Sequence, residues 1–237
     1  TVWDELNKRA ESFDVTLKNE SRDVAMIAVQ GPKAAEILVP LVEDKKQDEV
    51  YNLGYYAATM GKVARTFAII ARTGYTGEDG FELIVYNSDA PQLWEELLKA
   101  GAEYDLKPCG LAARDSLRLE AGMPLYGNEL SRDITPVEAG MARAFAKKEA
   151  DFVGSEVIRQ RAAEGPQVAI TGLTSTQRRA ARAGAEVFVG DEKVGTVTSG
   201  QPSPTLGHPV AIALLETSAE LEPGAEVEVE IRGKRYP

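Results

Sequence analysis

The sequence predicts an α+β protein whose C-terminal part is a small antiparallel barrel or sandwich. Two observations lead to this fold class. Up to about residue 163, apolar runs of strand length alternate with segments of helical spacing. Beyond Arg161 the chain consists of short β-like runs that are separated by Gly and Pro turns. The change places a boundary near Glu164-Gly165-Pro166.

The first part of the chain begins with a helix-like segment over residues 2–10. Residues 24–29 form a short apolar run that Gly31 and Pro32 close, and Pro suits the first turn of a helix. The pattern therefore predicts a strand that enters a helix over residues 33–40. A polar, acidic stretch follows at residues 43–50.

The next segments predict two neighbouring strands and two helices. Residues 62–71 and 80–86 are rich in apolar and β-branched residues and flank a Gly-rich turn. Residues 90–100 carry leucines at helical spacing with Gly101 as a stop, and a second helix is expected over residues 110–121. The strand runs of the C-terminal part are residues 167–172, 185–189, 193–198, 210–215 and 225–231.

Composition excludes several classes of function. The 237 residues are 43% hydrophobic, which is enough apolar material for one large or two ordinary domains. A formal net charge of −10 without a basic face makes nucleic acid an unexpected partner. We expect no membrane span, because no stretch approaches about 18 consecutive apolar residues. One cysteine, Cys109, and one histidine, His208, exclude an intrachain disulfide and a zinc site made of soft ligands. A cytoplasmic location is the expectation.

The densest motif is Arg-Thr-Gly-Tyr-Thr-Gly-Glu-Asp-Gly-Phe-Glu at residues 72–82. Its glycines, Gly74, Gly77 and Gly80, permit positive φ and a close approach of the backbone to a ligand. An ordinary hairpin turn explains the same pattern. The motif has neither the order of a P-loop nor that of a dinucleotide fingerprint, which disfavours binding of nucleotide phosphates.

A second motif runs through residues 110–129 and places Arg114 and Arg118 four residues apart on one helix face. Like charges at this spacing repel unless an anion lies near them. The anion is either a ligand or a carboxylate such as Asp115, Glu120 or a distant residue, and the sequence leaves both open. A third motif at residues 195–206 is a strand that enters a Pro-rich loop, which is typical of a barrel corner.

In this order the three motifs resemble the glycine cleavage system T-protein (aminomethyltransferase) family, together with Leu-Tyr-Gly-Asn at 125–128 and Thr-Pro-Val-Glu-Ala-Gly at 135–140. The resemblance implies an α+β cloverleaf fold of three domains around a folate site, with a C-terminal antiparallel β-barrel. It assigns residues 1–24 to the end of a stretch of the second domain and 25–115 to the main part of the first domain. Residues 116–163 then return to the second domain, and 164–237 form the barrel.

The resemblance also assigns site residues. Glu82 holds the position that grips the pterin, and two carboxylate oxygens suit two parallel N–H donors. Tyr75 holds the position of an aromatic that lines the folate site, and Arg114 that of an arginine that contacts folate. The residues in the same motifs with a supporting role are Asp115, Arg118 and Asn128.

The reaction implied by the resemblance moves the aminomethyl carbon from the lipoylated H-protein to tetrahydrofolate and releases ammonia, without a metal. In the family an aspartate near the N-terminus helps to activate the folate amine, and no residue here matches it. No catalytic residue is therefore assigned. We expect the sequence to be truncated at the N-terminus and slightly at the C-terminus, with little turnover by residues 1–237 alone.

Two other assignments stay open. The folate-binding module of a sarcosine or dimethylglycine oxidase shares the architecture, and a flavin domain in the parent protein would favour it. A non-catalytic folate-binding protein of iron–sulfur cluster assembly carries a Cys-containing motif in the equivalent loop. Here that loop is Tyr75-Thr76-Gly77-Glu78, without cysteine, which argues against this second alternative.

Overall fold

The computed structural model describes residues 2–145 and 148–237 and divides the chain into two compact units, Thr1–Pro108 and Cys109–Pro237. Each unit is built around its own cluster of buried apolar side chains. The finer division into residues 25–115, 116–163 and 164–237 stays a prediction.

The first unit contains a four-stranded antiparallel sheet in the described residues, with the strand order β1-β4-β3-β2. Its strands are β1 (Val24–Gln30), β2 (Ala58–Val63), β3 (Thr66–Ala71) and β4 (Gly80–Tyr86). The predicted strands at 24–29 and 80–86 are confirmed. The predicted neighbours also pair, because Ile69 on β3 lies opposite Ile84 on β4.

The prediction of one continuous strand over residues 62–71 is wrong. Ala64 and Arg65 both have positive φ, 47° and 71°, and they turn the chain between Val63 and Thr66, which pair with each other. Two-residue hairpin turns of this kind usually carry Asn or Gly because those residues tolerate positive φ. Because Ala64 and Arg65 are not typical turn residues, the sequence does not indicate where one strand ends and the next begins.

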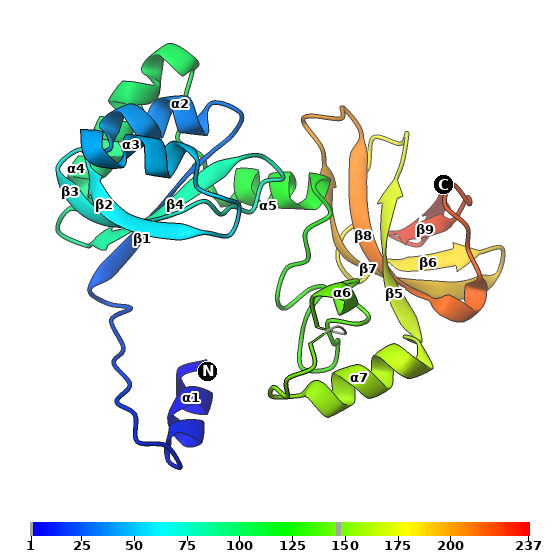
Figure 1. Ribbon diagram of the computed structural model, residues 1–237. Helices are drawn as coiled ribbons and strands as arrows, with labels where there is room; N and C mark the ends of the chain where they lie inside the picture. Colours follow the sequence, from blue (N-terminus) through cyan, green and yellow to red (C-terminus); the bar gives the residue numbers. More distant parts are fainter. Residues whose placement is uncertain (1, 146–147) are drawn as a thin grey trace. The chain divides into compact units, whose positions relative to one another are not determined.

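The helices of the first unit that belong to its core cover one face of the sheet, as Figure 1 shows for α2, α3 and α4. Their bounds are α2 (Ala34–Leu38), which continues as the 3-10 turn η1 (Val39–Leu41), α3 (Asp44–Tyr51) and α4 (Ala90–Gly101), followed by η2 (Ala102–Tyr104). Helix α1 (Val2–Ala10) contributes no buried residue. Helix α3 forms in the acidic stretch for which the sequence predicted no element.

Buried and more exposed side chains alternate along the strands, so the sheet has one buried face and one open face. Phe81 and Leu83 on β4 and Ile70 on β3 are 0% exposed, and they pack with Leu38 of α2 and Leu93 of α4 in the core of the unit. Full burial of one such side chain stabilises the fold by about 1.5 to 3 kcal/mol. The helices therefore fix which face of the sheet is left open.

The second unit contains a six-stranded antiparallel sheet in the described residues, with the order β10-β9-β6-β7-β8-β5. Its strands are β5 (Val168–Thr174), β6 (Glu186–Val189), β7 (Glu192–Pro202), β8 (Pro209–Glu216), β9 (Glu228–Ile231) and β10 (Lys234–Tyr236), with the 3-10 turn η3 (Thr217–Ala219) after β8. All five predicted strand runs are confirmed. The strands join in one sheet rather than two, so the predicted alternative of a two-sheet sandwich is not formed by the described residues.

In the described residues of the second unit, three helices precede the barrel: α5 (Leu111–Glu120), α6 (Ala142–Phe145) and α7 (Ser155–Glu164). Helix α5 confirms the prediction over residues 110–121 and contacts β7 and β8. Helix α7 was not predicted. Within the described ranges no helix combines the length and the apolar character that a bilayer crossing requires.

We predict that Leu83→Ala lowers the free energy of unfolding of the first unit by about 2 to 5 kcal/mol, because it leaves a cavity at a fully buried position. Both tryptophans, Trp3 and Trp94, lie in this unit, so their fluorescence during urea unfolding reports on it. The control is Ile84→Ala, the next residue of β4, which faces the open side and should cost less than about 1.5 kcal/mol. Equal costs for the two variants would contradict this orientation of β4.

Candidate functional site

Glu82 lies on the open face of the first unit's sheet, among small side chains. In the strand register it is opposite Ala28 on β1 and Ala71 on β3, and Ala71 is opposite Ala58 on β2. Directly opposite residues in a sheet have Cβ atoms only about 5 Å apart. On both neighbouring strands, half-buried Glu82 is therefore opposite a side chain no longer than a methyl group.

The neighbouring row of the same face is apolar across all four strands. Met26 lies opposite Ile84, Ile84 opposite Ile69, and Ile69 opposite Met60. Met26 and Met60, at the two ends of this row, are 55% and 59% exposed. The row of alanines and this apolar row together form a flat apolar floor beside one carboxylate, which suits a planar ligand that carries polar groups on one edge.

One oxygen of Glu82 is held in place by Thr73, two residues after β3. The Thr73 hydroxyl donates to Glu82 Oε2 at 2.5 Å. Among the described residues, no hydrogen bond is formed to the second oxygen, Oε1. The carboxylate thus has a fixed orientation and one acceptor oxygen that is available for a ligand.

Gln30, the last residue of β1, fastens the loop that carries Thr73. Its side-chain amide Nε2 donates to the main-chain oxygen of Thr73 at 3.1 Å and to that of Phe81 at 3.3 Å. Its Oε1 accepts a hydrogen bond of 3.3 Å from the Thr76 hydroxyl. Tyr75 is half-buried and lies between these two loop residues.

Two glycines of the motif leave space for the side chain of Gln30. A Cβ at Gly80 would lie 2.5 Å from the Gln30 carboxamide, and a Cβ at Gly74 would overlap it. Only Gly77 has a positive φ, of 79°. The sequence left two explanations of these glycines open, a close approach of the backbone to a ligand and an ordinary turn. In the structure, Gly74 and Gly80 leave space for the side chain of Gln30.

Arg72, the first residue of the motif, is a structural cross-link. Its Nε and Nη2 donate to the two carboxylate oxygens of Asp79 at 2.9 and 2.8 Å. Its Nη1 donates to the main-chain oxygens of Tyr51 and Leu53, at 2.8 and 2.9 Å. The hydrogen bonds and charge of Arg72 hold the pKa of Asp79 below its usual value, against the opposing effect of partial burial. Arg72 thus fastens the base of the loop to the end of α3.

A pair of tyrosines near Glu82 was missed by the sequence analysis. Tyr55 and Tyr56 are 51% and 78% exposed, with ring centroids 4.3 Å apart. The pKa of Tyr55 is raised by its hydrogen bond with Tyr56, by desolvation, and by the negative charges of Glu82 and Asp79. The main-chain amide of Tyr56 donates to Arg72 O, so the pair is attached to the same motif. Two consecutive tyrosines directly after Gly54 are the sequence feature that could have indicated this pair.

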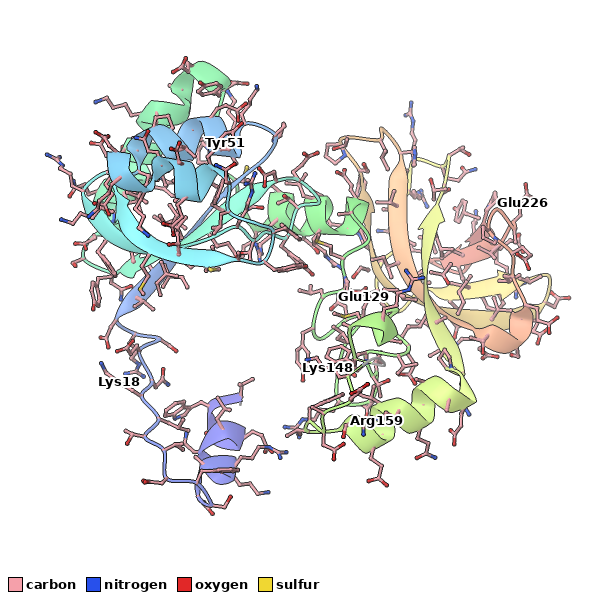
Figure 2. The ribbon with its side chains drawn as sticks, in the orientation of Figure 1. Lys18, Tyr51, Glu129, Lys148, Arg159 and Glu226 are labelled. Carbon is pink, nitrogen blue, oxygen red and sulfur yellow. The ribbon has the colours of Figure 1, made fainter. Side chains whose placement is uncertain are left out.

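The second unit gathers the supporting residues around Arg118, whose side chain is 1% exposed. Arg118 donates to Asp115 Oδ1 from Nε at 2.7 Å, to Glu129 Oε2 at 3.1 Å and to the Ser199 hydroxyl at 2.8 Å. Asn128 also donates to Ser199, at 2.9 Å. Glu129, which is 0% exposed, lies at the barrel strands (Figure 2) and accepts a hydrogen bond from Thr198 of β7.

The sequence left open whether a ligand or a carboxylate of the chain lies near Arg118. Its partners are carboxylates of the chain, one predicted, Asp115, and one distant in sequence, Glu129. Asp115 also accepts from Gln201 of β7, so α5 is attached to the barrel. Arg114 lies on the same helix and is exposed. Tyr75 and Glu82 belong to Thr1–Pro108, whereas Arg114, Asp115, Arg118 and Asn128 belong to Cys109–Pro237.

Among the described residues, His208 and Ser199 form no catalytic centre. His208 Nδ1 contacts the Thr174 hydroxyl and the Pro209 main-chain oxygen, while Ser199 is bound by Arg118 and Asn128. A hydrolase triad is therefore not formed by Ser199. In the part of the chain that the structure describes, no three His, Cys, Asp or Glu residues are grouped to hold a metal ion.

We predict that Asp79→Asn lowers the free energy of unfolding of the first unit by about 1 kcal/mol at pH 7, a small value because the carboxylate is 37% exposed and screened by solvent. The lowered folded-state pKa of Asp79 means that this contribution is present above its unfolded pKa of about 3.9. It is lost as the pH falls through the folded-state value.

The measurement is urea unfolding of both proteins between pH 7 and pH 3, followed by tryptophan fluorescence. The stability difference should shrink below about pH 4. Glu78→Gln, at an exposed position of the same loop, serves as the control. A difference that is independent of pH would contradict the assigned role of the Arg72–Asp79 pair.

Comparisons with known proteins place the chain in a family. The sequence profile of the GCVT N-terminal domain matches residues 1–149, and that of the glycine cleavage T-protein C-terminal barrel domain matches residues 169–237. The chain is 82% identical over all its 237 residues to an aminomethyltransferase of Corynebacterium aurimucosum and 49% identical to one of Streptomyces avermitilis. It spans only 64% and 63% of the lengths of these relatives.

A solved structure agrees with these matches. The crystal structure of glycine cleavage system aminomethyltransferase T from Bartonella henselae is 33% identical, with a TM-score of 0.81 over 99% of this chain and 62% of that one. The two domain matches together cover most of the chain, and the barrel that one of them names is the six-stranded sheet of the second unit. On this evidence, the chain belongs to the glycine cleavage T-protein family of aminomethyltransferases.

Proposed function

We propose that this chain carries folate-binding elements of an aminomethyltransferase. The reaction transfers the aminomethyl carbon from the lipoyl arm of an H-protein to tetrahydrofolate and releases ammonia. The observation that carries the proposal is Glu82, whose Oε2 is fixed by Thr73 while Oε1 accepts no hydrogen bond from the described residues. The names of the relatives, including the one from Corynebacterium aurimucosum, support the same reaction.

The floor around Glu82 fits a pterin ring. A pterin is flat and presents N–H donors side by side along one edge, which a carboxylate accepts through charge-assisted hydrogen bonds. Ala28 and Ala71 on either side leave room for such an edge, because their side chains end at Cβ. Ile84 and Ile69 in the next row offer apolar contact to a ring. Both properties follow from the register of the strands.

Two further residues are proposed to bind folate. Tyr75 lies in the loop that Gln30 fastens, and an aromatic ring with a hydroxyl suits the edge or face of a pterin. Arg114 is proposed from the family resemblance, because its planar guanidinium matches a carboxylate or carbonyl of folate. Asp115, Arg118 and Asn128 are proposed as supporting residues that hold α5 against the barrel.

The role of these residues in the reaction is to bind and orient. Glu82 fixes the pterin and thereby the direction of the folate nitrogens that meet the aminomethyl carbon, and correct orientation alone accelerates a reaction between two bound groups strongly. Exclusion of water protects the reactive carbon. No residue of this chain is proposed as the acid or base of the reaction.

The proposed partners are tetrahydrofolate and a lipoylated H-protein, without a metal, nucleic acid or membrane, in the cytoplasm. The folate module of a sarcosine or dimethylglycine oxidase is the alternative enzyme. The relatives compared above carry the name aminomethyltransferase over alignments that include the whole of this chain, which favours the first reaction. Ammonia release from an aminomethylated H-protein separates the two, because an oxidase module acts on a different donor.

We predict that Glu82→Gln weakens tetrahydrofolate binding by about 2 to 4 kcal/mol, because the amide places a donor against a pterin donor and removes a charged acceptor. Isothermal titration calorimetry with tetrahydrofolate under anaerobic conditions measures the dissociation constant. Glu78→Gln makes the same substitution at an exposed position four residues earlier and should leave binding unchanged. An unchanged affinity of Glu82→Gln would contradict the proposed site.

We further predict that residues 1–237 alone catalyse the aminomethyl transfer slowly. The family's aspartate has no match in this sequence, and loss of one positioned acid–base group commonly costs about 100- to 10,000-fold. The measurement is ammonia release from aminomethylated H-protein with tetrahydrofolate, next to the longer Corynebacterium aurimucosum relative as the reference. Comparable rates would show that the essential carboxylate lies within residues 1–237.

A further inference from the structure

We propose that Gln30 is a positioning residue for folate: its carboxamide fixes Thr73 and, through the Thr73 hydroxyl, the orientation of the Glu82 carboxylate. This inference rests on the proposed function, because it concerns the same carboxylate. Gln30 does not contact the ligand in this proposal. It lies on β1, and its side chain reaches across β4 to Thr73.

The first step of the argument is the reach of the side chain. Gln30 lies opposite Gly80 in the pairing of β1 with β4, on the open face of the sheet. Because Gly80 has no Cβ, the side chain passes over β4 and reaches the oxygen of Thr73, beyond the end of β3. One side chain thus links three adjacent segments of the sheet at the edge of the floor.

The second step is the link from Thr73 to Glu82. Thr73 is fixed at its main-chain oxygen by Gln30, and its hydroxyl donates to Glu82 Oε2 at 2.5 Å. A glutamate side chain has several rotamers of similar energy, so its orientation depends on such a partner. If Thr73 moves, the Glu82 carboxylate loses the hydrogen bond that fixes its orientation.

The third step is the need for a carboxamide. Two main-chain oxygens, of Thr73 and Phe81, each receive one hydrogen bond from Nε2, and the Thr76 hydroxyl donates to Oε1. A carboxylate offers no donors to the two oxygens, and a thioether of the same length offers neither donor nor strong acceptor. Gln30→Met therefore preserves the volume while it releases the loop that contains Tyr75.

The experiment compares single and double variants of the full chain. Gln30→Met and Thr73→Val each remove one link and should weaken tetrahydrofolate binding about tenfold, the size expected for loss of one or two hydrogen bonds. The matched control is Gln47→Met. Gln47 of α3 also donates to a main-chain oxygen, that of Val42 at 2.9 Å, but it lies on a helix that covers the other face. This control should leave the affinity unchanged.

A double-variant cycle shows whether Gln30 acts through Glu82. If it does, Gln30→Met should weaken binding about tenfold in the unchanged chain and less than about twofold when Glu82 is already Gln. Equal losses in both backgrounds would overturn the proposal, because Gln30 would then act independently of the carboxylate. Calorimetry provides all four dissociation constants.

The outcomes also separate this inference from the proposed function. A loss of affinity in Glu82→Gln without any loss in Gln30→Met overturns the positioning role and leaves the folate site in place. Absence of binding by the unchanged chain, or full affinity of Glu82→Gln, overturns the proposed function and the inference with it.

Hydrogen exchange tests the same link without a ligand. In Gln30→Met the amides of residues 73–81 should exchange faster, while those of α4 should not. Unchanged exchange in that loop would overturn the proposed link.

Discussion

The register between β1 and β4 is the constraint on which the first unit depends. It sets Ile27 and Val29 toward the helices and, on the other face, Ala28 opposite Glu82 and Gln30 opposite Gly80. A shift by one residue would exchange the two faces and place the Glu82 carboxylate in the apolar core, where an unpaired charge is very costly. Packing of α2 and α4 against β1 and β4 prevents that shift. The candidate site is thus a consequence of how the core is assembled.

The second unit buries a pair of charged side chains. Arg118 and Glu129 are both almost inaccessible, and removal of charges from water costs several kcal/mol for each. The cost is offset because Arg118 donates to Asp115, Glu129 and Ser199, and no buried side-chain polar atom among the described residues lacks a partner. These bonds link α5 to β7 with defined directions, which an apolar contact would not do.

Local patterns in the sequence predicted much of this structure, and long-range pairs explain what they missed. Alternating strands and helical spacing were sufficient for β1, β4, α4 and the barrel, because each is encoded by neighbouring residues. The turn at Ala64 and Arg65 carries no local signal, and the partner of Gly74 and Gly80 lies some 40 to 50 residues away at Gln30. Likewise, sequence placed Arg118 beside an anion, but the identity of Glu129 required the folded chain.

The overlap of Gln30 with any side chain at positions 74 or 80 also bears on how this loop can vary during evolution. A substitution of either glycine is disfavoured while Gln30 is present, and a smaller residue at position 30 loses the hydrogen bonds to the main-chain oxygens of Thr73 and Phe81. The three positions are therefore coupled by epistasis: viable alternatives require concerted changes rather than stepwise ones. Among homologues, residues 30, 74 and 80 should covary as a set, although they are scattered along the chain.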